Sequence, residues 1–440
     1  MKAKALIFSL LLVTSTIYSQ KSLIQSGPMV GYSQMMESVV WIQTNESADV
    51  KMNYWLKGDS SLKMNSELIT TKKQTAFTAK LLADDVKPGN TYEYEIVVNG
   101  RTVDFDYPLE FQTQKLWQWR GDAPDFEFVI GSCFYVNEPD YDRPGKGYGS
   151  EYEIVQSIHE KNPDFMIWLG DNIYLREVDW NSRTGILHRN THTRSLPELQ
   201  PLLASTHHYA IWDDHDFGPN NSNRSFWAKD LTLEAFELFW ANPSFGVNGN
   251  PGITTYFEWA DCEFFLLDNR YYRSPQYRKN TEREIFGEEQ IEWLIDALSS
   301  SSAPFKFVAM GSQFLNPYVG YENYSTYSAE REKLLNLIEE AGITGVIFFS
   351  GDRHLSEISK LERYGTYPLY DITISSLTAG SNTWPPEANY YRVDGTLTQK
   401  HNFAMLKVTG PRKNRLLTIK DYDKDGNELW KFEINENDLK

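Results

Sequence analysis

Six short apolar runs in the second part of the chain constrain its fold more than any other feature. They are FEFVIGSC, DFMIWLGD, HYAIWDDHD, CEFFLLDNR, FKFVAMGSQ and GVIFFSGDRH. Between them lie stretches with helical periodicity, at 151–160, 230–240, 288–298 and 329–339. Apolar β-rich runs that alternate with helices are typical of an α/β domain. We therefore predict such a domain over residues 125–440, and we expect its last part, from Ile372 onward, to return to strands and hairpins.

Each of the six runs ends in polar side chains of the kind that bind metals or donate hydrogen bonds. In chain order these are Cys133, Asp171 with Asn172, Asp213–Asp216, Asp268–Arg270, Ser312 with Gln313, and Asp352–His354. The carboxyl ends of parallel strands meet at one edge of a sheet, so we expect these side chains to converge. Carboxylates gathered without counter-charge repel one another and their pKa values rise. Metal ions of charge two or three remove that conflict, so the sequence predicts a metal cluster.

Residues 21–115 have a different pattern, which indicates an all-β domain. ESVVWIQT, DVKMNYWLKG, QTAFTAKLL, TYEYEIVVNG and LEFQTQ are short alternating runs separated by turn residues. That spacing is typical of a β-sandwich. The segment KPGNTYEY, which begins at Lys87, resembles the corner of fibronectin type III domains. Because this part lacks a cluster of metal-type or nucleophilic residues, we predict a structural or orienting role for it.

The first 20 residues have the features of a secretory signal peptide. Lys2 and Lys4 precede an apolar run over 5–13, and small and polar residues follow. The run is too short to anchor the protein permanently in a membrane. We predict cleavage near Ser19 or Gln20 and an exported protein, either periplasmic or secreted.

The net charge and the two cysteines further limit the functions that the protein can have. The formal net charge of −17 argues against non-specific binding to nucleic acid or to anionic membranes. Cys133 and Cys262 leave two alternatives open. They form one disulfide in an oxidising compartment, or they act separately, Cys262 as a core thiol and Cys133 at a strand tip that carries chemistry.

The motifs at the strand tips resemble those of the PhoD-like alkaline phosphatase family, within the calcineurin-like metallophosphoesterases. They are GSC (131–133), GDNIY (170–174), WDDHD (212–216) followed by Asn220, GSQ (311–313) and SGDRH (350–354). The resemblance implies a metallophosphoesterase β-sandwich flanked by helices, in four layers α/β/β/α, after the fibronectin III-like sandwich. The G-H-x-H signature of ordinary calcineurin-like enzymes is absent from the sequence, which favours the PhoD-like subgroup.

The resemblance also implies a set of metal ligands for Fe³⁺ and Ca²⁺. Cys133 and Tyr174 correspond to the thiolate and phenolate that hold ferric iron, and both anionic groups suit a trivalent ion. Asp171 corresponds to the carboxylate that bridges iron to calcium. Asn220 corresponds to an amide ligand, for which Asn221 is the alternative. Asp352 and His354 correspond to the metal-binding pair of the last motif.

The same resemblance implies roles in catalysis. His215 corresponds to a histidine near the leaving-group oxygen, and we interpret it as the general acid, oriented by Asp216. In the alternative interpretation His215 is a structural partner of the surrounding carboxylates. Arg353 either clamps a phosphoryl oxygen or pairs with Glu357. Asn172 and Arg270 are candidate substrate contacts. The segment 384–391, WPPEANYY, either walls the site or packs as an exposed loop.

These residues predict metal-assisted hydrolysis of a phosphate monoester or diester. One alternative is an extracellular binding protein on a catalytically inactive fold, and another is an enzyme for lactones or sulfate esters. The sequence does not determine the physiological ester or the oligomeric state.

Overall fold

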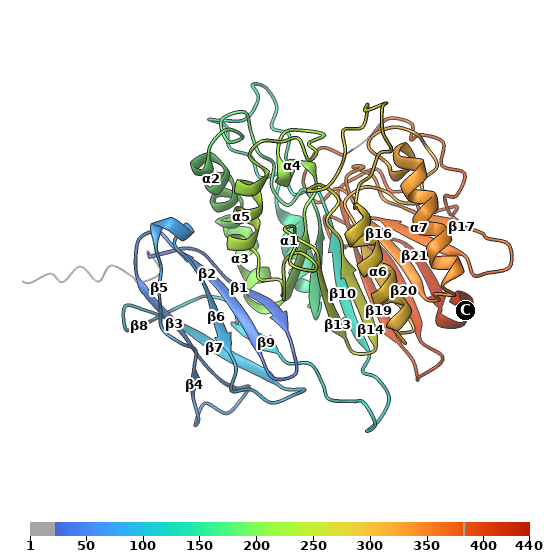
Figure 1. The fold of residues 1–440 in the computed structure, drawn as a ribbon. Helices are drawn as coiled ribbons and strands as arrows, with labels where there is room; N and C mark the ends of the chain where they lie inside the picture. The colour runs from blue at the N-terminus through green and yellow to red at the C-terminus, as the bar shows by residue number, and fades with distance from the viewer. Residues whose placement is uncertain (1–22, 382) are drawn as a thin grey trace, which may run out of the picture.

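The computed structural model of the protein, drawn in Figure 1, describes residues 23–381 and 383–440. The predicted signal peptide lies outside these residues. The described chain contains an N-terminal pair of small sheets and, after it, two six-stranded sheets with helices on their outer faces.

The N-terminal strands form a β-sandwich. One sheet has the order β1-β2-β6; the other has the order β4-β3-β7-β8, with β5 beside β3 and β9 beside β7. The strands are β1 (Ile24–Ser33), β2 (Ser38–Thr44), β3 (Asp49–Leu56), β4 (Met64–Asn65), β5 (Ile69–Thr70), β6 (Thr78–Ala83), β7 (Thr91–Val98), β8 (Arg101–Val103) and β9 (Glu110–Gln112). The alternating inward side chains of both sheets, among them Val40, Met52, Leu81 and Phe111, share one core.

The predicted fibronectin-like corner occurs before β7. The hydroxyl of Tyr92 accepts a hydrogen bond from the backbone N–H of Lys87 at 2.7 Å. A tyrosine hydroxyl that bonds to backbone a few residues upstream fixes the chain reversal in such sandwiches.

Two six-stranded sheets form the centre of the larger region. Their orders are β12-β11-β10-β19-β20-β21 and β13-β14-β15-β16-β18-β17. The strands are β10 (Phe126–Gly131), β11 (Phe165–Leu169), β12 (His207–Ile211), β13 (Thr255–Trp259), β14 (Cys262–Leu266), β15 (Lys306–Ala309), β16 (Val346–Ser350), β17 (Glu357–Leu361), β18 (Leu369–Thr373), β19 (Asn402–Thr409), β20 (Leu416–Asp423) and β21 (Glu428–Asn435). Strands β10, β11 and β12 are parallel to one another, as are β14, β15 and β16.

The two sheets pack face to face through aromatic side chains. The ring of Phe128 in β10 lies 5.4 Å from that of Phe264 and 5.7 Å from that of Phe307, both in the other sheet. Helices cover the outer faces, with α3 and α5 on the side of the N-terminal strands and α6 and α7 on the other (Figure 1). The helices are α1 (Glu153–Glu160), α2 (Arg183–Arg194), α3 (Gln200–Ser205), α4 (Asp214–Phe217), α5 (Lys229–Phe239), α6 (Glu288–Ser300) and α7 (Ser328–Glu340). The layered α/β/β/α class that was predicted is confirmed.

The six apolar runs are divided between the two sheets. The first three form β10–β12, and the last three form β14–β16. The apolar runs alone predicted one strand edge, whereas the family resemblance implied two sheets. The strand tips that converge belong to two stacked sheets. Apolar periodicity shows that a strand is buried on both faces; it does not show which sheet the strand joins.

Helix α2 was not predicted, because its inward face is polar. Arg189, Asn190, Thr193 and Arg194 are buried, and Ile186 is the one buried apolar side chain of the helix. Sequence patterns find helices from an apolar stripe, and α2 lacks one. His188 and His192, which were expected in a polar loop, lie on this helix.

One histidine of β12, His207, holds the N-terminal sandwich against the larger region. His207 and His208, which were expected at the surface or at a cap, are buried. The Nδ1–H of His207 donates to the carbonyl of Gly31 at 2.7 Å, and its Nε2 accepts from the N–H of Gln112 at 3.1 Å. Strand β1 lies against β12 at this junction, where Ser33 donates its N–H to the Tyr209 hydroxyl. The neutral imidazole of His207 therefore links both N-terminal sheets to β12.

Lowering the pH should weaken this junction. Burial lowers the pKa of His207 to about 4, whereas in the unfolded chain it is about 6.5. Between these pH values His207 binds a proton in the unfolded chain but not in the folded chain. The free energy of unfolding therefore decreases as the pH is lowered. The slope is about 1.4 kcal/mol per pH unit, or roughly 3 kcal/mol over the window. Urea unfolding at pH 6.5, 5.5 and 4.5 should show a shallower pH slope for His207→Gln than for the unmutated protein. The control is His188→Gln, which changes an exposed histidine. Equal pH slopes of the free energy of unfolding in all three proteins would contradict the role given to His207.

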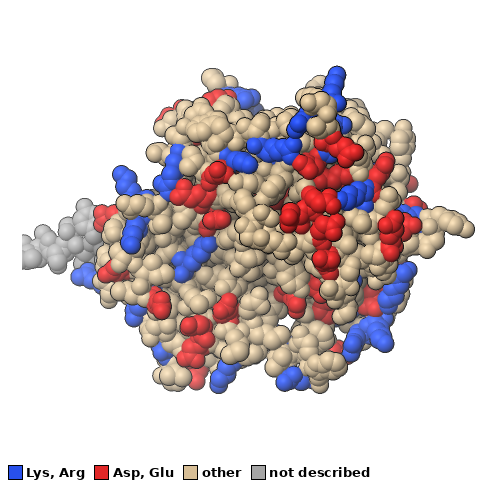
Figure 2. Space-filling view, viewed as in Figure 1, with Lys and Arg blue, Asp and Glu red and all other residues tan. Residues whose placement is uncertain are grey.

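Acidic side chains gather over α6 and α7 on the face shown in Figure 2. On α6 the exposed members are Glu288, Glu289, Glu292 and Asp296. Part of the negative charge thus lies on an outward helical surface.

Within residues 23–381 and 383–440, none of the helices has the length and apolar character needed to cross a membrane.

Candidate metal centre

The strand tips of the two stacked sheets meet around one pocket of about 420 Å³. The segments after β10, β11, β12 and β16 carry the predicted metal and catalytic residues to it. The pocket is lined by Tyr148, Asp171, His215, Asn220, Asn221, Tyr321, Glu322, Asp352, Arg353, His354 and Gly380. Most of the side chains selected from the sequence therefore lie in or directly behind a single cavity.

Four of the predicted ligands have left-handed backbone conformations. The φ angles of Cys133, Asp171, Asp352 and His354 are +60°, +52°, +65° and +52°. Each such conformation of a non-glycine residue costs about 1–3 kcal/mol, and such residues concentrate at functional sites. The strain turns each side chain back toward the pocket directly after its strand ends.

Glycines of the motifs allow the two sheets to approach at this end. A Cβ atom at Gly311 would lie 2.3 Å from Cγ of Asp213, and one at Gly170 would lie 2.8 Å from Cβ of Asp213. Gly170 also has a φ of +92°. Any larger residue at these positions would displace the Asp213 carboxylate.

The first group of candidate ligands consists of Cys133, Asp171 and His354. One ligand atom from each lies within 4.8 Å of the others. The Cys133 thiol is 3.6 Å from Asp171 Oδ2, and the Tyr174 hydroxyl is 3.3 Å from both that oxygen and His354 Nε2. Burial raises the pKa of Cys133 to about 12 and raises that of Tyr174 well above its ordinary value. A nearby cation would be needed to ionise these two groups, and their donor atoms suit a transition metal.

Two residues that the sequence analysis missed hold this group in place. Ser375 donates its hydroxyl to Cys133 Sγ at 3.1 Å and accepts the backbone N–H of His354 at 2.9 Å. The Tyr148 hydroxyl lies 3.2 Å from His354 Nδ1. Neither residue belongs to a motif at a strand tip, so only the folded chain brings them here.

A second group consists of Asp213, Asp214 and Asp352, whose oxygens also lie within 4.8 Å of one another. Burial and the charge of Asp213 raise the pKa of Asp352 to about 8. Asp213 Oδ2 and Asp214 Oδ1 are buried and have no hydrogen-bond partner among the described residues. Arg270 Nη2 lies 3.7 Å from Asp214 Oδ1, beyond hydrogen-bond distance. Buried carboxylate oxygens without hydrogen bonds are costly, and a hard cation with oxygen ligands would relieve them.

Asp171 belongs to a third group, with Asp214 and His215. It is therefore the ligand candidate shared between the thiolate side and the carboxylate side of the pocket. Burial and the charge of Asp214 raise the pKa of Asp171 well above its ordinary value. The bridging role predicted for Asp171 stays a prediction.

Arg270 lies behind the carboxylates as their counter-ion. It is fully buried, and its guanidinium contacts Asp213, Asp214 and Glu322. Burial alone would raise the pKa of Asp214, but the charges of His215 and Arg270 lower it to about 2. Glu322, which the sequence analysis missed, lies between Arg270 and Arg273.

The predicted substrate contacts Asn172 and Arg270 do not line the pocket. The side-chain amide of Asn172 donates to the carbonyl of Ile211 at 2.7 Å and is buried. Arg270 is held by carboxylates on its pocket side. Both residues lie behind the candidate metal ligands. In this geometry neither residue contacts a substrate in the pocket.

Asp216 has a different role from the one expected. Its two carboxylate oxygens accept the backbone N–H groups of Asn172, Ile173 and Asp213. It thereby caps the short helix α4 and joins β11 to β12 instead of orienting His215. His215 instead donates its backbone N–H to Asp171 Oδ1 at 3.1 Å, and its ring lies 4.2 Å from the ring of Tyr174.

Arg353 lines the pocket, and its ion-pair partner is Glu387 at 2.7 Å. Glu357, the partner considered from the sequence, is fully buried and pairs with Arg392. The Arg353 guanidinium also lies over the Tyr321 ring at 4.3 Å. Glu387 belongs to the segment 384–391, in which Trp384 and Tyr390 are exposed and do not line the pocket.

Asn220 and Asn221 lie at the exposed rim of the pocket. The side-chain amide of Asn220 donates to Asn221 Oδ1 at 2.8 Å, and the backbone N–H of Asn221 donates to Asp214 Oδ2 at 2.6 Å. Both alternatives for the amide ligand thus stay open.

Cys133 and Cys262 are both free and buried, so the two thiols act separately.

Comparison with known proteins identifies the family. The family model described as PhoD-like phosphatase matches residues 128–409, which include every strand tip described above. The chain belongs to the PhoD-like phosphatase family. A second family model, a domain of unknown function (DUF7800), matches residues 21–116. The resemblance predicted from the five motifs is confirmed.

A curated relative is alkaline phosphatase D of Bacillus subtilis (strain 168). It is 24% identical over 339 residues, which cover 66% of this chain and 55% of that protein. The chain thus spans little more than half the length of this relative.

Two solved structures share the fold of this PhoD-like chain. A structure of PhoD has a TM-score of 0.75 at 18% identity and covers 93% of this chain and 92% of that one. A purple acid phosphatase from yellow lupin seeds has a TM-score of 0.66 at 14% identity, over 93% of this chain and 74% of that one. At these identities the likeness shows the fold alone.

Proposed function

We propose that this protein is an exported, metal-dependent phosphoric ester hydrolase that acts on phosphate monoesters, diesters or both. The observation that carries the proposal is the convergence of Cys133, Asp171, Asp352 and His354, all in left-handed conformations, on one buried pocket of a PhoD-like chain. Export rests on the pattern of the first 20 residues.

The chemistry of the donors supports two kinds of metal in the pocket. Cys133 and Tyr174, with Asp171 and His354, would hold Fe³⁺, because thiolate and phenolate are anionic donors that suit a trivalent ion. Asp352, with Asn220 or Asn221, would hold Ca²⁺, which prefers carboxylate and amide oxygens. Bound metal ions would supply Lewis-acid stabilisation of the phosphoryl oxygens and a water of lowered pKa.

The chain's own residues would bind and protonate the substrate. Glu387 Oε1 accepts two N–H groups of Arg353, from Nε and Nη2, so three of its five donors stay available for phosphoryl oxygens. His215 would give a proton to the leaving-group oxygen. Burial lowers the pKa of His215, and the charge of Asp214 offsets part of that change. The lowered pKa makes the protonated imidazole a stronger acid toward the leaving-group oxygen.

Metal analysis and turnover together test this function. The purified protein should contain about one iron together with calcium, and it should hydrolyse bis-p-nitrophenyl phosphate or p-nitrophenyl phosphate. A chelator should abolish that hydrolysis, because the pocket without cations is an array of mutually repelling carboxylates. Full turnover after complete removal of metals would overturn the proposal. Absence of both metal and turnover would favour the alternative, a binding protein on the same fold.

A further inference from the structure

A second pocket, of about 640 Å³, adjoins the metal pocket. Tyr148, His215 and Asn220 line both cavities. The second pocket is otherwise formed by the segments that follow β10 and β11. Its lining comprises Tyr135, Asp142, Arg143, Pro144, Lys146, Tyr174, Leu175, Arg176, Glu177, Trp180 and Pro219 in addition to the three shared residues.

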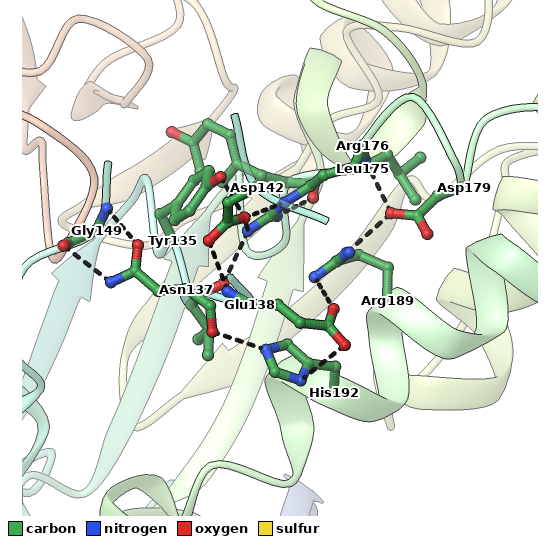
Figure 3. Close-up of polar contacts among 12 residues, drawn as sticks. Tyr135, Asn137, Glu138, Asp142, Gly149, Leu175, Arg176, Asp179, Arg189 and His192 are labelled. Atoms are coloured by element: carbon green, nitrogen blue, oxygen red, sulfur yellow. Dashed lines mark hydrogen bonds and ion pairs between the residues drawn. The ribbon is translucent and has the colours of Figure 1, made fainter. Parts of the chain in front are cut away.

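The floor of this pocket is fixed by a buried ion pair, shown in Figure 3. The Arg176 guanidinium stacks on the ring of Tyr135 at 3.9 Å and donates from Nε and Nη2 to Asp142 Oδ1, at 3.0 and 2.8 Å. The Tyr135 hydroxyl donates to the same carboxylate oxygen at 2.8 Å. Arg176 also bonds to the carbonyls of Tyr174 and Val136. The aromatic floor is therefore held in one orientation before any ligand arrives.

The ion pair is itself anchored to helix α2. Asp179 accepts the backbone N–H of Arg176 at 2.8 Å and the Nε–H of Arg189 at 2.9 Å, and Arg189 pairs with Glu138 at 2.7 Å (Figure 3). Asp179 and Arg189 are almost completely buried. This network accounts for the buried Arg189 of α2, and its hydrogen bonds and ion pairs restrict the segments around the second pocket. A rigid site loses less conformational entropy when it binds a ligand.

The walls of the second pocket favour a flat apolar group. Tyr148 and the half-buried Trp180 offer ring faces, and Pro144 and Leu175 add apolar surface. Cavities of about 300–1,000 Å³ with apolar and aromatic walls are typical of sites for small organic ligands. The volume greatly exceeds that of a short alkyl alcohol.

We propose that the second pocket binds the leaving group of the substrate, and that this group is bulky and has an aromatic or other flat apolar face. The inference rests on the proposed hydrolytic function. A general acid must reach the leaving-group oxygen, and His215 stands where the two pockets meet. The phosphoryl group would then occupy the metal side of His215, and the leaving group would occupy the side of Tyr148 and Trp180.

Binding of phosphonates tests the inference without requiring turnover, because the C–P bond is not hydrolysed by this chemistry. The metal-loaded protein should bind 1-naphthylphosphonate at least about tenfold more tightly than methylphosphonate, in isothermal titration calorimetry, because the ring buries apolar surface. Trp180→Ala should remove most of this preference and leave the affinity for methylphosphonate within about twofold, since only the apolar wall changes. Trp119→Ala, which removes an exposed tryptophan outside both pockets, should keep the preference.

The outcomes separate the two proposals. Equal binding of both phosphonates by the unmutated protein would overturn the leaving-group pocket, whatever the enzyme hydrolyses. Equal weakening of both ligands in Trp180→Ala would also overturn it, because that result indicates a general effect on the metal pocket. If Trp180→Ala does not fold, Trp180→Leu, which keeps apolar bulk and removes the ring, should reduce the preference in the same comparison. A retained preference for the naphthyl ligand without turnover of any ester would refute the hydrolytic function and leave an aromatic binding pocket.

Discussion

Replacing Asp171 with asparagine is expected to empty the metal cluster and to reduce kcat/KM for bis-p-nitrophenyl phosphate by about a thousandfold or more. The carboxylate belongs to two of the three candidate ligand groups, so its loss weakens both sides of the pocket. Metal ions contribute several kcal/mol of charge stabilisation to such reactions, and each 1.36 kcal/mol is a factor of ten in rate. Metal content of the purified variant and its turnover are the measurements.

Stability distinguishes loss of metal from general damage in this variant. Without metal, burial and the charge of Asp214 disfavour the Asp171 carboxylate. Metal-free Asp171→Asn should therefore have a Tm equal to or higher than that of the metal-free parent. Asp371→Asn is a matched control, because Asp371 is also fully buried but accepts hydrogen bonds from Phe314, Leu315 and Ser350, away from the pocket. It should retain the metal and the turnover, because its hydrogen-bond partners lie away from the pocket. Normal metal content and turnover in Asp171→Asn would contradict the assignment.

Replacing His215 with glutamine should lower kcat by a factor of about 10² to 10⁴, the usual contribution of a general acid. The loss should be largest for an alkyl phosphate ester, whose leaving group needs a proton. It should be smaller for p-nitrophenyl esters, whose leaving group is stable as an anion. Metal content should stay normal, because Asp171 and Asp214 would still hold the ions in the group that they share with His215.

Two results would show a different role for His215. Loss of metal would identify it as a ligand, and an equal loss of rate for alkyl and p-nitrophenyl esters, with a lowered Tm, would identify it as a structural partner of the carboxylates. His188→Gln is the matched control, since that histidine is exposed on α2 and lines neither pocket. It should leave kcat unchanged for both kinds of ester.

The sequence was sufficient for the order of strands and for the residues at their tips. Apolar runs long enough for a strand and flanked by helical periodicity identify buried strands, and β10, β11, β12, β14, β15 and β16 follow the six predicted runs. Polar residues at the carboxyl ends of such strands have to face a common site. Cys133, Asp171, Asp352 and His354 were therefore found by their position in the chain and by their chemistry.

The roles of polar residues next to those tips depended on tertiary contacts. Asp216 and Asn172 are of residue types that often bind metals or substrates. Their side chains instead form hydrogen bonds with backbone groups. Arg270 became a buried counter-ion because Glu322, 52 residues away in the chain, lies beside it. A motif gives the type of a side chain and its strand, but its partners come from loops whose paths the local sequence does not determine.

The sequence by itself determined which segments are strands and which side chains stand at their ends, because burial and periodicity are local properties of the chain. Only the tertiary structure decided which strand joins which of the two sheets, that Ser375 and Tyr148 support the ligands, and that a second pocket adjoins His215. Those features arise where distant segments pack, and packing depends on the shapes and charges of all the partners at once.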